Sequence, residues 1–326
     1  MIRKILYILF IICTFTTLAC ENIDKMLIDC ALKNDIECVK KAIKGGANVN
    51  IRINEGEYKG YTLLMWAAKN GNTVLAKILI DAKADVNAKT TVGRTALMEA
   101  SMKGNLQILE ILIKGGADVN AVQSEALFLA IFDKHKEVVK LLLKAKADVN
   151  ADNGRHLKVS SSYNGNLEIA KLLIENGADV KKYGGPALLE AAKYRHVEIV
   201  RLLLKNGADV NYGARYEIAD PGPVVMQAMN FGSLEIIRLL LTYGANPNTK
   251  AAGSKTLLMV AAERKSYETI KLLLEKGADV NLTDGGGATA LDYVINATDS
   301  RGLECKRLLL KAGARRGSGK PVQIIQ

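Results

Sequence analysis

The sequence is poor in the residues that most often build metal, disulfide and catalytic sites. Its 326 residues include five cysteines, three histidines and one tryptophan, and aromatic residues make up only 5%. Five cysteines without a Cys-x-x-Cys pair are too few for a disulfide-built scaffold or a zinc site. The histidines, His135, His156 and His196, lie far apart, and none shares a predicted helical face with another ligand. A metal site is therefore not expected.

Sequence motifs of catalysis are missing as well. The sequence has no recognisable motif that pairs a nucleophile with a general base, and no pair of carboxylates at a spacing typical of general acid–base catalysis. The glycine run 285–287 lacks the lysine that a phosphate-binding loop requires, and we interpret it as a flexible turn. The sequence therefore predicts neither an enzyme nor a bound cofactor.

Proline is scarce too, with five residues, whereas Leu, Ala, Lys, Gly and Asn recur in blocks. Hydrophobic residues make up 49% and charged residues 24%, which is typical of a folded globular chain and excludes disorder over most of its length. Blocks of these residue types favour an all-helical, repetitive architecture.

The first 19 residues have the pattern of an export signal. Arg3 and Lys4 precede an apolar run over 5–15, and small residues lead to Ala19 and Cys20. The run is shorter than the roughly 20 residues that span a membrane. We therefore expect residues 1–19 to be a cleaved signal peptide and the mature chain to be exported.

The end of this segment, residues 17–20, resembles the lipobox of bacterial lipoproteins. Thr17 stands where such boxes usually carry leucine, and Leu18 follows one step later. The resemblance implies that Cys20 carries a lipid, so that the mature chain contacts the membrane of a bacterial cell envelope, in the periplasm or on the outer surface. Ordinary cleavage after Ala19, without lipid, remains the alternative.

A short motif recurs along the rest of the chain. It reads GADVN in its commonest form, and an amphipathic run such as LEIAKLLIEN precedes it each time. A shorter apolar segment, for example TLLMWAAKNG, precedes that run. The motif's alanines recur every 30 to 37 residues, at Ala47, Ala84, Ala117, Ala147, Ala178, Ala208, Ala245, Ala278 and Ala314.

These segments resemble the ankyrin repeat, a 33-residue unit with two antiparallel helices. The resemblance covers residues 24–314 and implies nine repeats. The expected fold is all-α: a solenoid of stacked helix-turn-helix units joined by hairpin-like fingers, in which each unit contacts only its neighbours. We place the array at 20–314 and expect a mobile basic tail at 315–326.

Some repeats depart from the pattern. Lys83 and Lys146 replace the glycine that ends the second helix, and each should cost about 1 kcal/mol if the left-handed conformation is kept. The fifth repeat has Lys158 where others have an apolar residue, and serines where others have alanine. We expect this repeat to open most easily.

The resemblance also assigns the histidines and cysteines. His135 and His196 occupy the inter-helix turn and are expected to be structural, and His156 stands where a helix-starting threonine would cap. Cys13 leaves with the signal. Cys30 and Cys38 fall on the two helices of the first repeat, where a bridge is conceivable, but we expect buried free thiols.

The chain is basic, with a net charge of +11. Basic residues recur at one position of the second helix, usually three residues after a glutamate, a spacing that stabilises exposed helices. They are Lys40, Lys77, Lys140, Lys171, Arg201, Arg238, Lys271 and Arg307. We interpret them as a solvated outer face, with polyanion or membrane binding as the alternative.

Partner contacts in this family come from the fingers and from the residues just before the inter-helix turn, which together form a concave face. At those positions four successive repeats carry an aromatic residue: Phe132, Tyr163, Tyr194 and Phe231. Short fingers precede the fourth to sixth repeats. A long finger over 212–222, with Tyr212, Arg215 and Tyr216, precedes the seventh.

The resemblance implies a non-catalytic protein–protein interaction module, an adaptor, scaffold or inhibitor, that binds a protein on its concave face. The alternative interpretation of the four aromatic residues is that their rings pack on one another or recur by chance. We expect a monomer, a protein partner and no nucleic acid. The alternative function is an envelope protein that binds a surface or a polyanion through its basic outer face.

Overall fold

The computed structural model describes residues 23–163, 165–213, 223–251 and 254–318. These residues form helices and connecting turns, with no strand among them beyond the isolated bridges Arg52–Thr62 and Lys250–Thr256. The all-α prediction is therefore confirmed. No helix in these ranges combines the length and the apolar character needed to cross a membrane.

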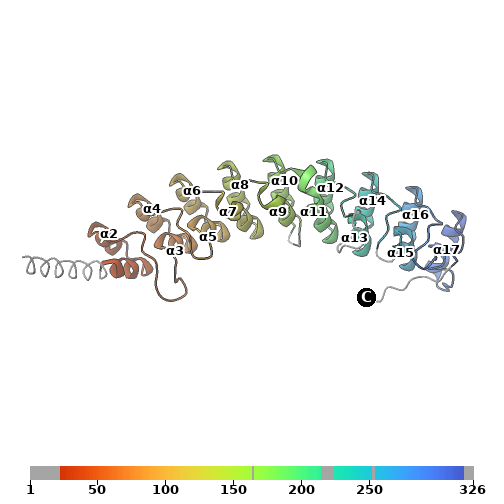
Figure 1. Ribbon diagram of the computed structural model, residues 1–326, viewed down its shortest axis with the longest axis horizontal. Coiled ribbons are helices and arrows are strands. Elements are labelled where there is room, and N and C mark those ends of the chain that lie inside the picture. Colours follow the sequence, from red (N-terminus) through yellow and green to blue (C-terminus); the bar gives the residue numbers. More distant parts are fainter. Residues whose placement is uncertain (1–22, 164, 214–222, 252–253, 319–326) are drawn as a thin grey trace, which may run out of the picture. The chain divides into compact units, whose positions relative to one another are not determined.

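The chain divides into two compact units, Met1–Ala151 and Asp152–Gln326. The first unit begins with a helix over residues 23–32, which pairs with α2. Its later helices follow as consecutive pairs (Figure 1). Their bounds are α2 Ile36–Lys44, α3 Leu63–Asn70, α4 Thr73–Asp81, α5 Ala96–Lys103, α6 Leu106–Lys114, α7 Ala121–Phe132 and α8 Lys136–Lys144.

The second unit repeats the same arrangement. Residues 290–296, where we expected the first helix of the last repeat, form consecutive turns instead, so the count of nine repeats stays a prediction. The helices are α9 Ala151–Ser160, α10 Leu167–Glu175, α11 Val180–Lys193, α12 Val197–Lys205, α13 Val224–Asn230, α14 Leu234–Thr242, α15 Leu257–Glu263, α16 Tyr267–Glu275 and α17 Ser300–Lys311.

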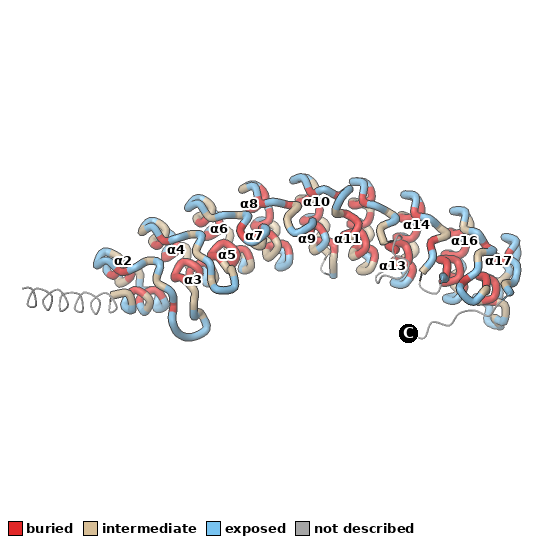
Figure 2. The backbone as a smooth tube through the Cα atoms, in the orientation of Figure 1, coloured by how far each residue is buried: buried red, intermediate tan, exposed pale blue. Residues whose placement is uncertain are grey.

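In each unit the core lies between a row of first helices and a row of second helices. Helix α5 packs between α3 and α7, and α6 packs between α4 and α8. The buried parts of the backbone face the neighbouring helices, while the turns are exposed (Figure 2). Side chains such as Leu75, Leu109 and Leu142 are fully buried, and each contributes about 1.5–3 kcal/mol.

Helix starts follow from the sequence. The hydroxyl oxygens of Thr62, Thr95 and Thr256 each accept a hydrogen bond at 3.3 Å from the backbone N–H three residues later. Such a cap satisfies one of the amides that the first turn leaves unpaired, and it is typically worth about 1 kcal/mol. Threonine at this position therefore fixes where the first helix of a repeat begins.

Helix ends also agree with the predictions. The second residue after the second helix is left-handed at Gly46, Gly116 and Gly177, where glycine tolerates this conformation. Lys83 and Lys146 keep it, with φ of 69° and 68°. The expected strain at these two lysines is therefore present.

The asparagine of the exit motif joins each repeat to the next. Asn50 Oδ1 accepts from Asp85 N at 2.7 Å, and Asn87 Oδ1 accepts from Asp118 N at 2.7 Å. We call this series of contacts the asparagine ladder. Its other members are Asn120 with Asp148, Asn211 with Asn246, Asn248 with Asp279 and Asn281 with Arg315.

The first long finger, residues 51–61, is a hairpin. Ile53 N donates to Tyr61 O and Gly60 N donates to Ile53 O, both at 2.8 Å. Arg52 fastens the hairpin to the following finger, because its guanidinium donates to Gly60 O and to Lys89 O. The expected hairpin-like finger is confirmed here.

The short fingers are helical turns rather than loops. Residues 122–124, inside α7, and residues 152–154, inside α9, are all left-handed, with φ between 50° and 73°. Before the sixth repeat, α11 instead continues through the finger from Val180 to Lys193. A single left-handed turn connects two repeats in few residues, but it strains every residue that has a side chain.

One prediction needs correction. Cys30 and Cys38 form a disulfide and are not free thiols, because the paired helices bring their Cα atoms to 5.7 Å. Cys305 is free and buried.

The first residues of the predicted tail contact the last repeat: Gly317 N donates to Asp292 Oδ2 at 2.7 Å, and Thr289 Oγ1 donates to Arg315 O at 2.7 Å. The rest of the predicted tail, residues 319–326, lies outside the described residues.

Candidate functional site

The inter-helix turns of the second unit carry three of the seven residues predicted to contact a partner, Tyr163, Tyr194 and Phe231. We call this row of turns the turn edge; it consists of Tyr163, Tyr194, Arg195, Phe231, Gly232, Arg264, Lys265 and Ser266. Tyr194, Phe231 and Arg264 each follow directly after a first helix. Arg195, Gly232 and Lys265 come next and are left-handed, which turns the chain toward the second helix.

Three of the four predicted rings lie on this edge. Tyr163 is 75% exposed and Phe231 is 37% exposed, while Tyr194 is half-buried. The rings of Tyr163 and Tyr194 meet edge to face, with centroids 5.6 Å apart. Lys193 Nζ lies 5.3 Å from the centroid of the Tyr194 ring. The two tyrosines thus pack on each other and still present Tyr163 to solvent.

The fourth ring, Phe132, belongs to the first unit. It is 57% exposed and stacks on Phe128, with ring centroids 6.0 Å apart. Phe132 and Tyr163 each lie three residues before the residue that caps the next helix. Tyr194 and Phe231 lie only two residues before it. The sequence placed all four near the turn but did not resolve these two registers.

The candidate residues of the long finger before the seventh repeat are Tyr212, Arg215 and Tyr216, and only Tyr212 is described by the structure. Tyr212 is half-buried against α11: a Cβ added at Gly185 would lie 2.3 Å from its ring. Tyr212 therefore packs partly within the repeat array, and its assignment as a partner contact stays a prediction. Arg215 and Tyr216, like Cys20, lie outside the described residues.

The histidines hold neighbouring turns together. His135 Nε2 lies 3.1 Å from Met102 O, and His196 Nε2 lies 2.9 Å from Ser162 O. His156 is fully buried. The structural roles predicted for His135 and His196 are confirmed. Within the described ranges, no group of three His, Cys, Asp or Glu side chains is placed to hold a metal ion.

The basic outer face is partly neutralised. Four of its eight basic side chains, those of Lys40, Lys140, Lys171 and Arg201, form an ion pair with the glutamate three residues earlier, at 2.8–3.5 Å. All four pairs are largely exposed, so each contributes little to stability. They do reduce the attraction of this face for a polyanion.

Sequence reasoning missed one buried cluster in the first unit. Glu99 is only 1% exposed, and its Oε1 accepts from Arg94 at 2.7 Å and from the Tyr61 hydroxyl at 2.8 Å. Burial, together with the hydrogen bond to Glu99, raises the pKa of Tyr61. The cluster ties the first long finger to α5. Arg94 and Tyr61 each directly precede a helix-starting threonine, and this shared position was the available signal.

A buried cation stands at the same position in the second unit. Lys255, directly before Thr256, is buried and bonds both carboxylate oxygens of Glu263 at 3.0 Å. Its Nζ lies 4.9 Å from the centroid of the Tyr293 ring. Both clusters join fingers to helices, and among the described residues Glu99 Oε2 is buried without a hydrogen-bond partner. Neither cluster presents an exposed aromatic ring, so neither is the first choice for a partner site.

The comparison with known families agrees with this fold. A model of the family "Ankyrin repeats (3 copies)" matches residues 27–123, 92–153, 127–214 and 225–317. The chain therefore belongs to the ankyrin repeat family, whose members are generally non-catalytic protein–protein interaction modules. No curated protein matches the chain.

Proposed function

We propose that the protein is an envelope-anchored adaptor, scaffold or inhibitor that binds a protein partner through the turn edge of its second unit. The observation that carries this proposal is the exposed ring of Tyr163 beside Tyr194, with Phe231 exposed on the same edge. Aromatic side chains offer a large contact area at a low entropic cost and dominate many interfaces.

The test compares two sets of substitutions. Tyr163→Ala, Tyr194→Ala and Phe231→Ala remove the exposed rings, whereas Tyr243→Ala removes an exposed ring at the other end of a helix pair. A partner is first identified by affinity capture from the native envelope with mass spectrometry, then purified and titrated. Each turn-edge anchor should cost about 2 kcal/mol of binding free energy, and Tyr243→Ala should leave the affinity unchanged.

Circular dichroism of each variant controls for folding. If affinity survives the loss of all three rings but falls on neutralising Lys77, Arg238 and Lys271, the turn-edge assignment is wrong. Binding through the basic outer face would then take its place, and it would weaken strongly with added salt.

The envelope location is part of the same proposal. It is supported by the charged start, the apolar run and the small residues before Cys20. The Cys30–Cys38 disulfide also supports it, because disulfides persist mainly in oxidising compartments. Labelling cells with a palmitate analogue tests it: wild-type protein should take up label and Cys20→Ser should not. Label on Cys20→Ser would contradict lipidation at this residue.

A further inference from the structure

The space above the inter-helix turns is filled by a planar side chain at three places. The residue directly before a second helix reaches back over the turn of the preceding repeat. Asn105 Nδ2 donates to Ala68 O at 2.8 Å, and the rings of His135 and His196 reach Met102 O and Ser162 O. A Cβ added at the glycine beneath each histidine would lie within 2.7 Å of the ring. The ring and the glycine therefore fit each other closely.

The same space is open above Gly232. The residue directly before α16 is Ser266, whose side chain is too short to cover the turn and makes no capping hydrogen bond. A Cβ added at Gly232 would find only Arg195 Nη2, at 3.9 Å. Arg264 takes over the contact with the preceding turn, since its guanidinium donates to the carbonyls of Met229 and Asn230.

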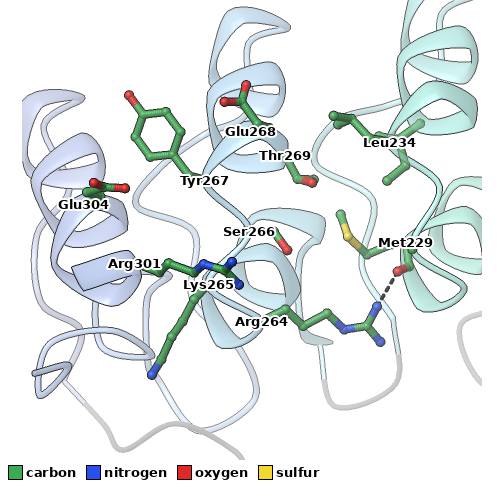
Figure 3. A pocket seen from close by; sticks show the side chains of 12 residues that line it. Met229, Leu234, Arg264, Lys265, Ser266, Tyr267, Glu268, Thr269, Arg301 and Glu304 are labelled. Carbon is green, nitrogen blue, oxygen red and sulfur yellow. Dashed lines mark hydrogen bonds between the residues drawn. The ribbon is translucent and has the colours of Figure 1, made fainter. Parts of the chain in front are cut away.

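A recess of about 510 Å³ results (Figure 3). Met229 and Leu234 stand on one side of it, Tyr267 and Glu268 on the other, and Arg264 runs along its base. We call it the Ser266 recess. It lies next to Phe231 on the turn edge, because Gly232 is among its lining residues.

The charges around the recess do not select an ion. Its lining includes Arg264, Lys265 and Arg301, but also Glu268 and Glu304, and Lys265 pairs with Asp299. The apolar lining residues are Leu234, which is half-buried, and Met229 and Ile237, which are almost fully buried. Thioether and guanidinium groups both contact aromatic rings favourably. The groups that a planar ring would contact are therefore mainly the Leu234 side chain and the Arg264 guanidinium.

We propose that the Ser266 recess is a subsite that accepts an aromatic side chain of the protein partner. The partner's ring takes the place that an imidazole of this chain fills above Gly104 and Gly165. It stacks against the Arg264 guanidinium and contacts Met229 and Leu234. The proposal rests on the proposed function, because it assumes that the turn edge meets a partner.

The experiment needs no partner. The mature chain, with methyl-labelled methionine, is titrated with N-acetyl-tyrosinamide, and the methyl signal of Met229 is followed by NMR. In the wild type the Met229 signal should shift in a saturable way. Ser266→Ala keeps the recess open and should bind as the wild type does. Ser266→His restores the imidazole and should weaken binding at least tenfold while raising the Tm.

Leu234→Gln provides a second variant, since it makes the apolar lining polar at this residue while the helix remains, and it should also weaken binding. Equal shifts at Met229 and at methionines outside the recess, or unchanged binding in Ser266→His and Leu234→Gln, would overturn the proposal. Such a result would not contradict partner binding by the rings of the turn edge. Loss of partner affinity on removing Tyr163, Tyr194 and Phe231 is a separate result that tests only the proposed function.

Discussion

At the scale of single residues, the non-glycine residues in the left-handed conformation carry the most backbone strain. Lys83 and Lys146 could be foreseen, because the exit motif requires glycine there. The left-handed conformation of Val122 could not be predicted, since nothing in the sequence around it marks it. A β-branched residue with φ of 50° is an outlier. Strain of this kind is local, so it can be removed without changing the fold.

We therefore expect Val122→Gly to stabilise the protein by about 0.5–1 kcal/mol, since the relief of left-handed strain exceeds the entropic cost of glycine. Val74→Gly is the matched control, because Val74 is similarly exposed but lies in the right-handed helix α4. It should destabilise by a comparable amount. Urea midpoints of the two variants measure the difference, and shifts of the same sign would contradict the strain argument.

The second prediction for a single residue concerns the carboxyl group of Asp292. Burial pushes its pKa up, but hydrogen bonds from Gly317, Thr289 and Arg316 outweigh burial, and the pKa lies below its ordinary value. A carboxyl with a lowered folded pKa stabilises above its unfolded pKa of about 3.9, and that stability is lost as pH falls through the folded pKa. The contribution should therefore be complete at neutral pH.

We expect Asp292→Asn to cost about 1–3 kcal/mol at neutral pH, because amides from Thr289 and Gly317 lose a charged acceptor. The gap from the wild type should close below about pH 4. Asp35→Asn is the control, since Asp35 is exposed and asparagine can still cap α2. Denaturation at several pH values tests this, and a gap that widens in acid would show that Asp292 is not the group responsible.

At the scale of elements, the sequence pattern predicted most of what is observed. Helical spacing, helix-starting threonines and exit glycines are local signals, so the helices and their caps follow from them. The left-handed fingers, the docking of Arg315 and Gly317 on the last repeat, and the Ser266 recess depend on contacts between distant residues. Of the candidate site, the exposed rings of Tyr163 and Phe231 were predicted, whereas the packing of Tyr212 was not.

The fifth repeat remains the predicted weak element. Lys158 is exposed at the position where Leu189 of the following repeat is buried, and the hydroxyls of Ser160 and Ser161 donate to Leu157 O. These bonds satisfy the hydroxyls but do not replace the missing apolar burial. We expect hydrogen exchange to be fastest over residues 156–176, and Lys158→Leu to slow it. Uniform protection across the repeats would contradict this.

The asparagine ladder has a gap in the second unit. Lys181 stands where the other exits have asparagine and cannot accept from Asp209 N, although its side chain lies beside Gly207. We expect Lys181→Asn to complete the ladder and to raise stability by about 1 kcal/mol. Lys182→Asn, one residue further along α11, is the control. Equal effects of the two changes on the urea midpoint would count against the ladder.

At the scale of the whole molecule, unfolding should not be a single transition. The array divides near residue 151 into two compact units, and solenoid repeats are stabilised only by their neighbours. The tryptophan at position 66 lies in α3, so its fluorescence reports the first unit, whereas circular dichroism reports both. We expect the two probes to give different urea midpoints. Coincident curves would show that the units unfold together.

The asparagine ladder also bears on how such a chain can change its length over generations. Each contact joins the exit of one repeat to the exit of the next, so the repeats of the ladder carry an asparagine acceptor and a backbone donor at fixed positions. A recombination event that copies or deletes a whole repeat leaves each remaining acceptor facing a donor. The number of repeats can therefore vary by duplication without any new contact having to arise, except at Lys181, where a copied repeat would inherit the gap.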